Sequence, residues 1–217
     1  MEKVVIYGIK QQAQQLCFYI ENEGCAEVAA FVVDREYQTC RNLCGHPVLC
    51  FEDALVQYPP QEYKMVVSFA YQHMVHDREE KCLKSRRVGY HLFTFVSQYA
   101  TVFTESIGEG VIIYPGCHVA CGVVLGDGNF LETGVTIAHH TRVGNWNFFA
   151  PAATVCGNVI IGDHNFIGSN ATVISSVVLE NEVLVGAGAV VQNAENQNVY
   201  LPARTVKWHG KSSEMKI

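Results

Sequence analysis

Two adjacent histidines, His139 and His140, are the residues of this sequence best suited to acid–base chemistry. An imidazole titrates near neutral pH, so it can take the proton of an attacking amine or hydroxyl group. Cys121 and Gly157 lie eighteen residues before and after His139. A glycine packed beside the ring would leave room for it and expose a backbone N–H, which suits a developing oxyanion. Such a pair of groups would support direct transfer of an acyl group from a thioester, without a covalent enzyme intermediate.

A period of six residues indicates how these groups come together. Every sixth residue from Ile107 to Val191 is aliphatic, except for Phe149, and the following residue is repeatedly small. Neither a strand, with period 2, nor a helix, with period 3.6, produces this pattern. It predicts a three-sided solenoid with one short strand per hexad, an inward aliphatic side chain and a small residue that turns the corner. Three hexads form a coil, so residues eighteen apart stack.

The first 95 residues alternate between strand and helix signals. Apolar runs at 4–7, 28–33, 65–69 and 92–96 predict four strands, with a turn at 45–47 and helices at 51–58 and about 74–88. A further helix is predicted by the spacing of Ala13, Leu16, Cys17 and Ile20. This alternation predicts a small parallel sheet of Rossmann-like βαβ type. We therefore expect an α/β acceptor-binding domain at 1–97, a parallel β-helix at 98–198 and a C-terminal cap and tail at 199–217.

The composition argues against several classes of binding partner and several cellular locations. The net charge of −6 argues against nucleic acid or an anionic membrane surface as a partner. No apolar run reaches 18 residues, and the start of the chain lacks the features of a signal peptide. Nine scattered cysteines do not form a disulfide framework, so we expect reduced thiols in a cytoplasmic protein.

One cluster has residue types that bind metals. Cys40, Cys44, His46 and Cys50 lie close together in the sequence, but their spacing is not that of paired zinc ligands. Cysteines that serve as small hydrophobic residues near a turn explain them more simply. We therefore expect no metal site.

The chain resembles the left-handed β-helix acyltransferases. The resemblance covers nearly the whole chain and is strongest over VTIAHHTRVGNWNFFAPAATVCGNVIIGDHNFIGSNATVI, with further matches at VVIYG, FVVD, GHPVL and LPAR. The sequence is most similar to the bacterial sugar acyltransferases typified by the sialic-acid O-acetyltransferase and the bacillosamine-pathway amino-sugar N-acetyltransferase. This resemblance implies a homotrimer with acetyl-CoA in the groove between adjacent solenoids, and an N-terminal domain that binds a nucleotide-linked sugar.

The resemblance also implies roles for particular residues. His139 matches the catalytic base, and His140 stands where the family has an acidic residue. His140 could bind substrate, or the group that orients His139 could come from Glu132, one hexad earlier, or from a neighbouring subunit. The implied contacts to CoA are Gly157, Phe148 and Ala187, and the implied contacts to the acceptor are Gly8, Lys10 and Asp34.

The first turn departs from the family pattern and leaves a second acceptor class open. The family carries several glycines there, whereas this chain has Gly8 alone, with Lys10 as a cation that replaces backbone N–H contacts. This weaker turn favours a free sugar, an amino acid or a natural product as acceptor. Two further alternatives are a metal-dependent β-helix hydratase and a scaffold without catalysis.

Other residues of the solenoid have simpler expected roles. Trp146, Phe148 and Phe149 are expected to pack at the trimer interface or to form a wall of the CoA groove. His118 and His164 lie at other positions of the hexad than His139, and we expect both to be solvated surface residues.

Overall fold

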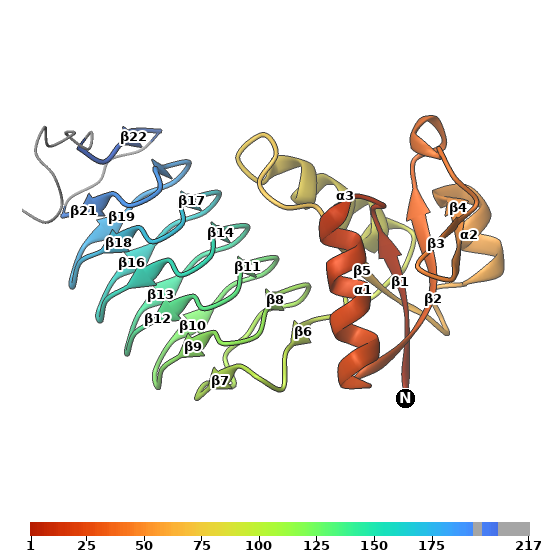
Figure 1. Ribbon diagram of the computed structural model, residues 1–217, viewed down its shortest axis with the longest axis horizontal. Coiled ribbons are helices and arrows are strands. Elements are labelled where there is room, and N and C mark those ends of the chain that lie inside the picture. Colours follow the sequence, from red (N-terminus) through yellow and green to blue (C-terminus); the bar gives the residue numbers. More distant parts are fainter. Residues whose placement is uncertain (193–196, 204–217) are drawn as a thin grey trace, which may run out of the picture.

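The computed structural model describes residues 1–192 and 197–203. An N-terminal α/β unit adjoins one end of a solenoid whose coils are stacked away from it (Figure 1). Of the predicted cap and tail, residues 204–217 lie outside the described residues, whereas 199–200 form a closing strand. No described helix is long and apolar enough to cross a membrane.

The α/β unit is built on a five-stranded sheet with the order β3-β4-β2-β1-β5. Its elements along the chain are β1 (Glu2–Tyr7), α1 (Gln11–Glu23), β2 (Ala26–Val33), a 3-10 turn (Arg35–Tyr37), β3 (Asn42–Leu43), β4 (His46–Cys50), α2 (Phe51–Gln57), β5 (Lys64–Val67) and α3 (His76–Arg87). The apolar face predicted for α1 is the face that is buried. Helix α1 lies on the side of the sheet that faces the solenoid, where Tyr19 contacts Tyr114 (Figure 1).

Two sequence predictions for this unit were wrong in detail. The segment predicted as a turn is an antiparallel β3–β4 hairpin, because Cys44 and Gly45 both take positive φ and reverse the chain there. The sheet is therefore mixed, not purely parallel. The predicted strand 92–96 joins the sheet only through one bridge from Leu92 to Met65. Its last two residues form β6 (Phe95–Val96), which pairs with β8 of the solenoid. The division of the chain at residue 97 stays a prediction.

The solenoid has three faces, each a parallel sheet of two-residue strands. The first face runs β6, β8 (Ile112–Ile113), β11 (Phe130–Leu131), β14 (Phe148–Phe149), β17 (Phe166–Ile167), β20 (Leu184–Val185) and β22 (Val199–Tyr200). The second runs β7 (Thr101–Val102), β9 (His118–Val119), β12 (Thr136–Ile137), β15 (Thr154–Val155), β18 (Thr172–Val173) and β21 (Val190–Val191). The third runs β10 (Val124–Leu125), β13 (Arg142–Val143), β16 (Ile160–Ile161) and β19 (Val178–Leu179). Paired residues such as Thr136 and Thr154 are eighteen apart, which confirms the predicted coil.

The interior of the solenoid follows the hexad pattern. The aliphatic residues from Ile113 to Val191 are buried, as predicted. Asn129, Asn147 and Asn165 are also buried and form a ladder, because each side-chain oxygen accepts a hydrogen bond from the asparagine of the next coil or its backbone. A buried amide needs such a partner, so the ladder keeps three polar groups in the core without a large penalty.

The small residue of each hexad does not form the corner of the coil, as was predicted from the sequence. The left-handed backbone conformation falls two residues later, for example at His140 and Asn158, each with φ of 58°. The small residue instead lets the next coil approach: a Cβ atom on Gly126 would lie 2.6 Å from the carbonyl oxygen of Gly144. The corner and the close contact thus belong to different positions of the repeat.

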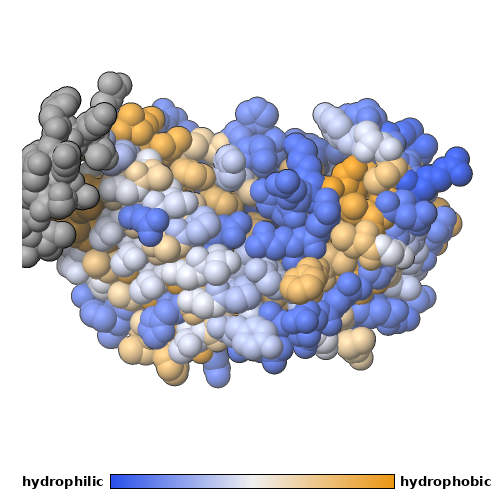
Figure 2. Space-filling view, in the orientation of Figure 1, coloured by the Kyte–Doolittle hydropathy of each residue, from blue (hydrophilic) through white to orange (hydrophobic). Residues whose placement is uncertain are grey.

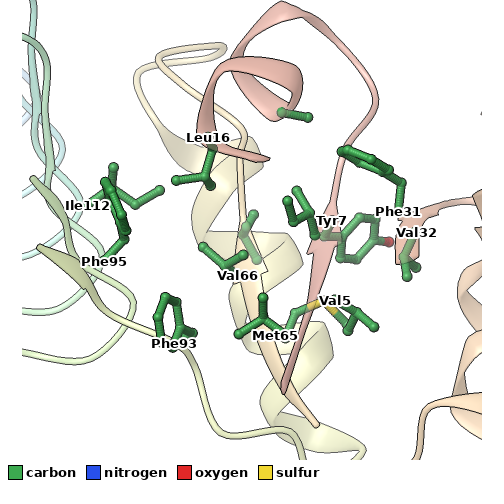
Figure 3. Close-up of a cluster of buried hydrophobic side chains, with 14 of the residues drawn as sticks. Val5, Tyr7, Leu16, Phe31, Val32, Met65, Val66, Phe93, Phe95 and Ile112 are labelled. Atoms are coloured by element: carbon green, nitrogen blue, oxygen red, sulfur yellow. The ribbon is translucent and has the colours of Figure 1, made fainter. Parts of the chain in front are cut away.

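The outer side of the first face packs against the α/β unit. Ile112, Phe130 and Phe148 point out of the solenoid and belong to the same buried cluster as the side chains of the N-terminal sheet. Figure 3 shows Ile112 and Phe95 beside Phe93, Leu16 and Val66. These contacts give the α/β unit and the outer side of the first face one hydrophobic core, which is separate from the core inside the solenoid.

The buried guanidinium of Arg78 crosses this boundary. Arg78 lies on α3 and is fully buried. It donates hydrogen bonds to the carbonyl oxygens of Val67 and Phe69 in the α/β unit and of Gly110 and Gly128 in the solenoid. Burial lowers the pKa of this guanidinium, and the four carbonyl oxygens compensate its charge in place of a carboxylate.

On the side of the molecule drawn in Figure 2, the outer surface is largely hydrophilic, and hydrophobic residues form small separate groups.

Candidate active site

His139 lies exposed at the corner between the second and third faces of the solenoid. We call this the histidine corner; it comprises the stacked turns 120–122, 138–140 and 156–158. The imidazole of His139 rests against Gly157 of the next coil, because a Cβ atom there would lie 2.6 Å from Cε1 and 2.7 Å from Nε2. The stacking that the sequence predicted therefore places the ring beside a position with no side chain.

The second histidine contacts the first. His140 takes the left-handed conformation of the turn, and its backbone N–H donates to the carbonyl oxygen of Cys121 over 3.1 Å. The Nδ1 atoms of His139 and His140 are 3.2 Å apart, so one ring donates to the other. The ring of His140 also lies over Gly122. Within the described chain, His140 is thus the side chain placed to orient His139.

The alternative orienting group, Glu132, lies at a different corner. It follows β11, between the first and second faces, and no contact with His139 is present. Its carboxyl group is half-buried, and this burial raises its pKa. The contact of His140 with His139 was not among the orienting groups predicted from the sequence, which were Glu132 and a neighbouring subunit.

Gly157 is buried beside the imidazole of His139, and its backbone N–H makes no hydrogen bond to the described chain. The carbonyl oxygen of Gly157 accepts from the N–H of Ser176, and the N–H of Asn158 donates to the backbone carbonyl oxygen of His139. A donor beside a solvent-exposed imidazole is the arrangement that stabilises an oxyanion formed next to a general base.

The aromatic residues expected at the groove lie inside the chain. Phe148 is 3% exposed; its ring stacks on Phe166, is tilted against Phe130 and makes an edge contact with Tyr71. It therefore does not line an open groove, and its expected contact with CoA is corrected. Trp146 and Phe149 are buried as well, so these three side chains are not available to a partner subunit. Ala187 is exposed, at the corner between the first and second faces.

The expected acceptor residues gather at the carboxyl ends of β1, β2 and β5. Gly8 has φ of 123°, and a side chain there would meet the hydroxyl of Ser68, so glycine is required. Asp34 follows β2 and Ser68 follows β5. Lys10 is exposed at the residue before α1. Ligands of parallel α/β sheets bind at this edge.

Two lysines form ion pairs with Asp34, and neither was predicted from the sequence. Its carboxylate accepts from the hydroxyl of Tyr7 at 2.5 Å and from Lys84 at 2.5 Å, and Lys81 lies 3.1 Å away. Burial raises the pKa of Asp34, but the hydrogen bonds from Lys84, Tyr7 and Lys81 outweigh it, so the pKa is lowered. Lys81 and Lys84 are one helical turn apart on α3, a spacing that is visible in the sequence.

The cysteine cluster does not assemble as a metal site. No three of Cys40, Cys44, His46 and Cys50 have ligand atoms grouped within metal-binding distance. His46 instead pairs with Glu21 at 2.7 Å.

The two histidines expected to be solvated differ in environment. His118 is half-buried beside Phe103. His164 contacts Glu79 and His76, so it is not a solvated residue. That correction arises because α3 lies along the corner that carries His164.

Comparison with known proteins agrees with this architecture. The family model "Bacterial transferase hexapeptide (six repeats)" matches residues 106–139 and 158–193. No curated protein sequence matches significantly.

Three solved structures illustrate the similarity over the whole chain. The acetyltransferase domain of PglB from Neisseria gonorrhoeae is 22% identical with a TM-score of 0.82, covering 93% of this chain and 97% of that one. PerB from Caulobacter crescentus is 25% identical with a TM-score of 0.80, covering 93% and 95%. WeeI from Acinetobacter baumannii is 21% identical with a TM-score of 0.77, covering 91% and 96%.

The hexad repeats, the α/β unit and these likenesses define an acetyltransferase of the left-handed β-helix type. Its similarity to the bacterial sugar acetyltransferases, first seen in the sequence, is confirmed.

Proposed function

We propose that this enzyme transfers an acetyl group from acetyl-CoA to the amine of a nucleotide-linked amino sugar. The contact between His139 and Gly157 carries the proposal, since it joins a base and an oxyanion donor at one exposed corner. The PglB domain has been solved with acetyl coenzyme A, and PerB with CoA and GDP-perosamine. Two further PerB structures carry asparagine or alanine in place of one histidine, with the same ligands.

The proposed mechanism uses His139 as general base. Its imidazole accepts the proton of the acceptor amine while the nitrogen attacks the thioester carbonyl carbon. The N–H of Gly157 donates to the oxyanion that develops on the carbonyl oxygen. As the C–S bond breaks, the imidazolium of His139 returns the proton to the departing thiolate of CoA. His140 holds the ring of His139 through the contact between their Nδ1 atoms. The same residues would serve transfer to a hydroxyl group.

An acceptor with a diphosphate group suits the edge of the N-terminal sheet. Lys81 and Lys84 both contact Asp34, although Lys81 also pairs with Glu80 at 2.9 Å, so the two lysines face two carboxylates. Lys10 adds an exposed cation at the start of α1, where the backbone N–H groups of the helix also favour an anion. These groups support the proposed nucleotide diphosphate. Gly8, Lys10 and Asp34 stay the proposed acceptor residues, joined by Lys81 and Lys84.

An exposed apolar stripe supports a subunit contact beside the histidine corner. Val124, Ile160 and Val178 lie on the outer side of the third face and are 38%, 49% and 51% exposed, and the exposed Arg142 stands between the first two. Stripes of this kind on a rigid face favour association. We propose a homotrimer in which the partner's solenoid covers this stripe and completes the acetyl-CoA groove, with Gly157 and Ala187 as contacts. Cytoplasmic localisation, consistent with the free cysteines, belongs to this proposal.

The test compares wild type with His139→Ala, following CoA release by chromatography with a panel of nucleotide-linked and free amino sugars. We expect His139→Ala to lose at least about 100-fold in turnover while CoA binding is retained. His118→Ala, on the second face, is the matched control and should keep full activity. Unchanged turnover in His139→Ala would remove this residue from the mechanism.

Thermal shifts with nucleoside diphosphates test the acceptor class, since binding stabilises the folded state by mass action. Stabilisation by none of them would favour the free-sugar alternative.

A further inference from the structure

A second histidine cluster lies where α3 meets the solenoid. His76 and Glu79 are one helical turn apart on α3, and His164 and Glu182 come from successive coils at the corner between the third and first faces. These segments are 85 or more residues apart in sequence, so only the docking of α3 brings them together. The cluster is separate from the histidine corner, which joins the second and third faces.

Two ring nitrogens converge on one carboxylate oxygen. Oε2 of Glu79 is 2.9 Å from Nε2 of His164 and 3.7 Å from Nδ1 of His76. One ligand atom from each of the three residues lies within 4.8 Å of the other two. In a tetrahedral zinc site with bonds of about 2.0–2.1 Å, neighbouring ligand atoms are about 3.3 Å apart. The observed separations therefore bracket the spacing that a zinc ion requires.

The surroundings of His76 call for a cation at this point. Its Nε2 lies 3.0 Å from Oε1 of Glu182, and its Nδ1 faces Glu79. A neutral imidazole has one N–H and one lone pair, so one of these carboxylates would face a lone pair. Either a proton or a metal ion resolves this conflict. The rings of His76 and His164 are stacked with centroids 4.2 Å apart, so both imidazoles lie beside Glu79.

The fourth residue has the place of a supporting carboxylate. With Nδ1 of His76 as a ligand, its Nε2–H donates to Glu182, the arrangement that fixes the orientation of metal-bound histidines. Glu182 is itself held by a hydrogen bond of 2.8 Å from Gln197. The site opens into a pocket of about 530 Å³ lined by His76, Asp163, His164, Asn181, Glu182 and Gln197. This leaves room for water at a fourth coordination position.

We propose that His76, Glu79 and His164 bind a divalent transition-metal ion such as Zn²⁺, with Glu182 as the supporting hydrogen-bond acceptor. Two histidines and one glutamate form a ligand set that zinc uses in proteins. The metal joins α3 to the solenoid and so fixes the α/β unit against the coils. No metal site was predicted from the sequence, and His164 was expected to be a solvated surface residue.

The test titrates chelator-treated full-length protein with Zn²⁺ by calorimetry and with Co²⁺ by absorption. We expect one metal ion per chain, a cobalt spectrum without thiolate charge-transfer bands and a higher Tm with zinc. His164→Asn and His76→Ala should abolish this binding. Asparagine suits the left-handed backbone at 164, as it does at the equivalent positions 158 and 170. Glu182→Gln should weaken binding about 10-fold or more, because the supporting carboxylate is lost.

Two controls separate this site from other ligands of the chain. His73→Asn removes an exposed histidine near the start of α3, and His46→Ala removes the histidine of the Cys17–Glu21–His46 group. Both variants should bind metal as wild type does. Wild-type protein that binds no more zinc than His164→Asn would overturn the proposal, and would mean that a proton on His76 resolves the cluster. Loss of binding in His46→Ala alone, or thiolate bands with cobalt, would overturn it as well.

Discussion

The imidazole of His139 occupies the space that a side chain at Gly157 would fill, one coil further along the solenoid. This relationship depends on the coil length of eighteen residues, which the paired strands show directly. Gly157 contributes two features here, the absence of a side chain and a backbone N–H. A substitution adds a side chain but keeps the N–H. The backbone of Gly157 is not in the left-handed region, so alanine is compatible with the turn.

Gly157→Ala is therefore expected to displace the ring of His139 while the fold is kept. The added Cβ would lie 2.6 Å from Cε1 of His139, a distance that the ring can relieve only by moving. We expect kcat to fall about 100-fold, since small misplacements of a catalytic group have effects of this size. Steady-state kinetics measures this loss. Ser175→Ala, one coil beyond in the same column, is the control and should have wild-type kcat. Equal kcat for the two variants would show that the ring position is unimportant.

Substitution of His140 tests how His139 is oriented. His140→Asn keeps a residue that tolerates the left-handed conformation but removes the imidazole 3.2 Å from His139. We expect kcat to fall about 10-fold, with little change in stability. His140→Asp places a carboxylate where the family has one, and should restore or exceed wild-type kcat because a carboxylate holds the ring and stabilises the imidazolium. If both variants match wild type, another group, such as one from a partner subunit, orients His139.

The sequence predicted the solenoid and its histidine corner because both follow from one repeat length. Once the hexad is recognised, counting eighteen residues from His139 finds Gly157 without any further knowledge of the fold. The same count finds Phe130, Phe148 and Phe166, which form a stacked column on the first face. Phe148, with Trp146 and Phe149, was predicted to pack at a subunit interface or to form a wall of the CoA groove, because the repeat does not say which face the α/β unit covers.

Contacts that depend on how α3 packs against the sheet and the solenoid could not be predicted from the sequence. Lys84 meets Asp34 across 50 residues, and His164 meets Glu79 across 85. Both contacts arise because α3 packs between the N-terminal sheet and a corner of the solenoid, with Arg78 bonded to both. The hairpin at β3–β4 was missed for a local reason, because its turn uses Cys44 in an uncommon backbone conformation.

Phe148→Ala should destabilise the protein and leave CoA binding unchanged. The ring is 3% exposed and contacts Tyr71, Phe130 and Phe166, so truncation leaves a cavity at the boundary with the α/β unit. Substitutions of this kind cost about 3–5 kcal/mol of the free energy of unfolding. Urea denaturation measures the loss, with Thr154→Ala on the second face as the control. A raised KM for acetyl-CoA with normal stability would instead restore Phe148 to the groove.

Arg78→Met should lower the free energy of unfolding by about 3 kcal/mol or more. The variant leaves four buried carbonyl oxygens without their donor, and each unsatisfied group costs about 1–3 kcal/mol before the structure relaxes. Arg86 lies two turns along the same helix and pairs with Glu109 and Asp127 at the surface. Arg86→Met should cost about 1 kcal/mol or less, as is usual for exposed ion pairs. Because Arg86 also contacts the solenoid, comparable losses in the two variants would show that the buried contacts of Arg78 stabilise the boundary no more than these ion pairs do.

Asp34→Asn should lose stability at neutral pH but not in acid. The folded protein lowers the pKa of Asp34, since the hydrogen bonds from Lys84, Tyr7 and Lys81 outweigh the effect of burial. A carboxylate with a lowered pKa stabilises the fold above its unfolded pKa of about 3.9, and this contribution is lost as the pH falls through the lower folded value. The difference in free energy of unfolding between wild type and Asp34→Asn should thus be constant from pH 7 to about pH 5 and shrink below about pH 4.

Urea titrations across this pH range measure the difference. Asp53→Asn, whose carboxylate is exposed beside Arg35, is the matched control and should follow wild type throughout. A difference for Asp34→Asn that persists unchanged into acid would mean that the ionised carboxylate contributes nothing, and that the two lysines are held by other groups.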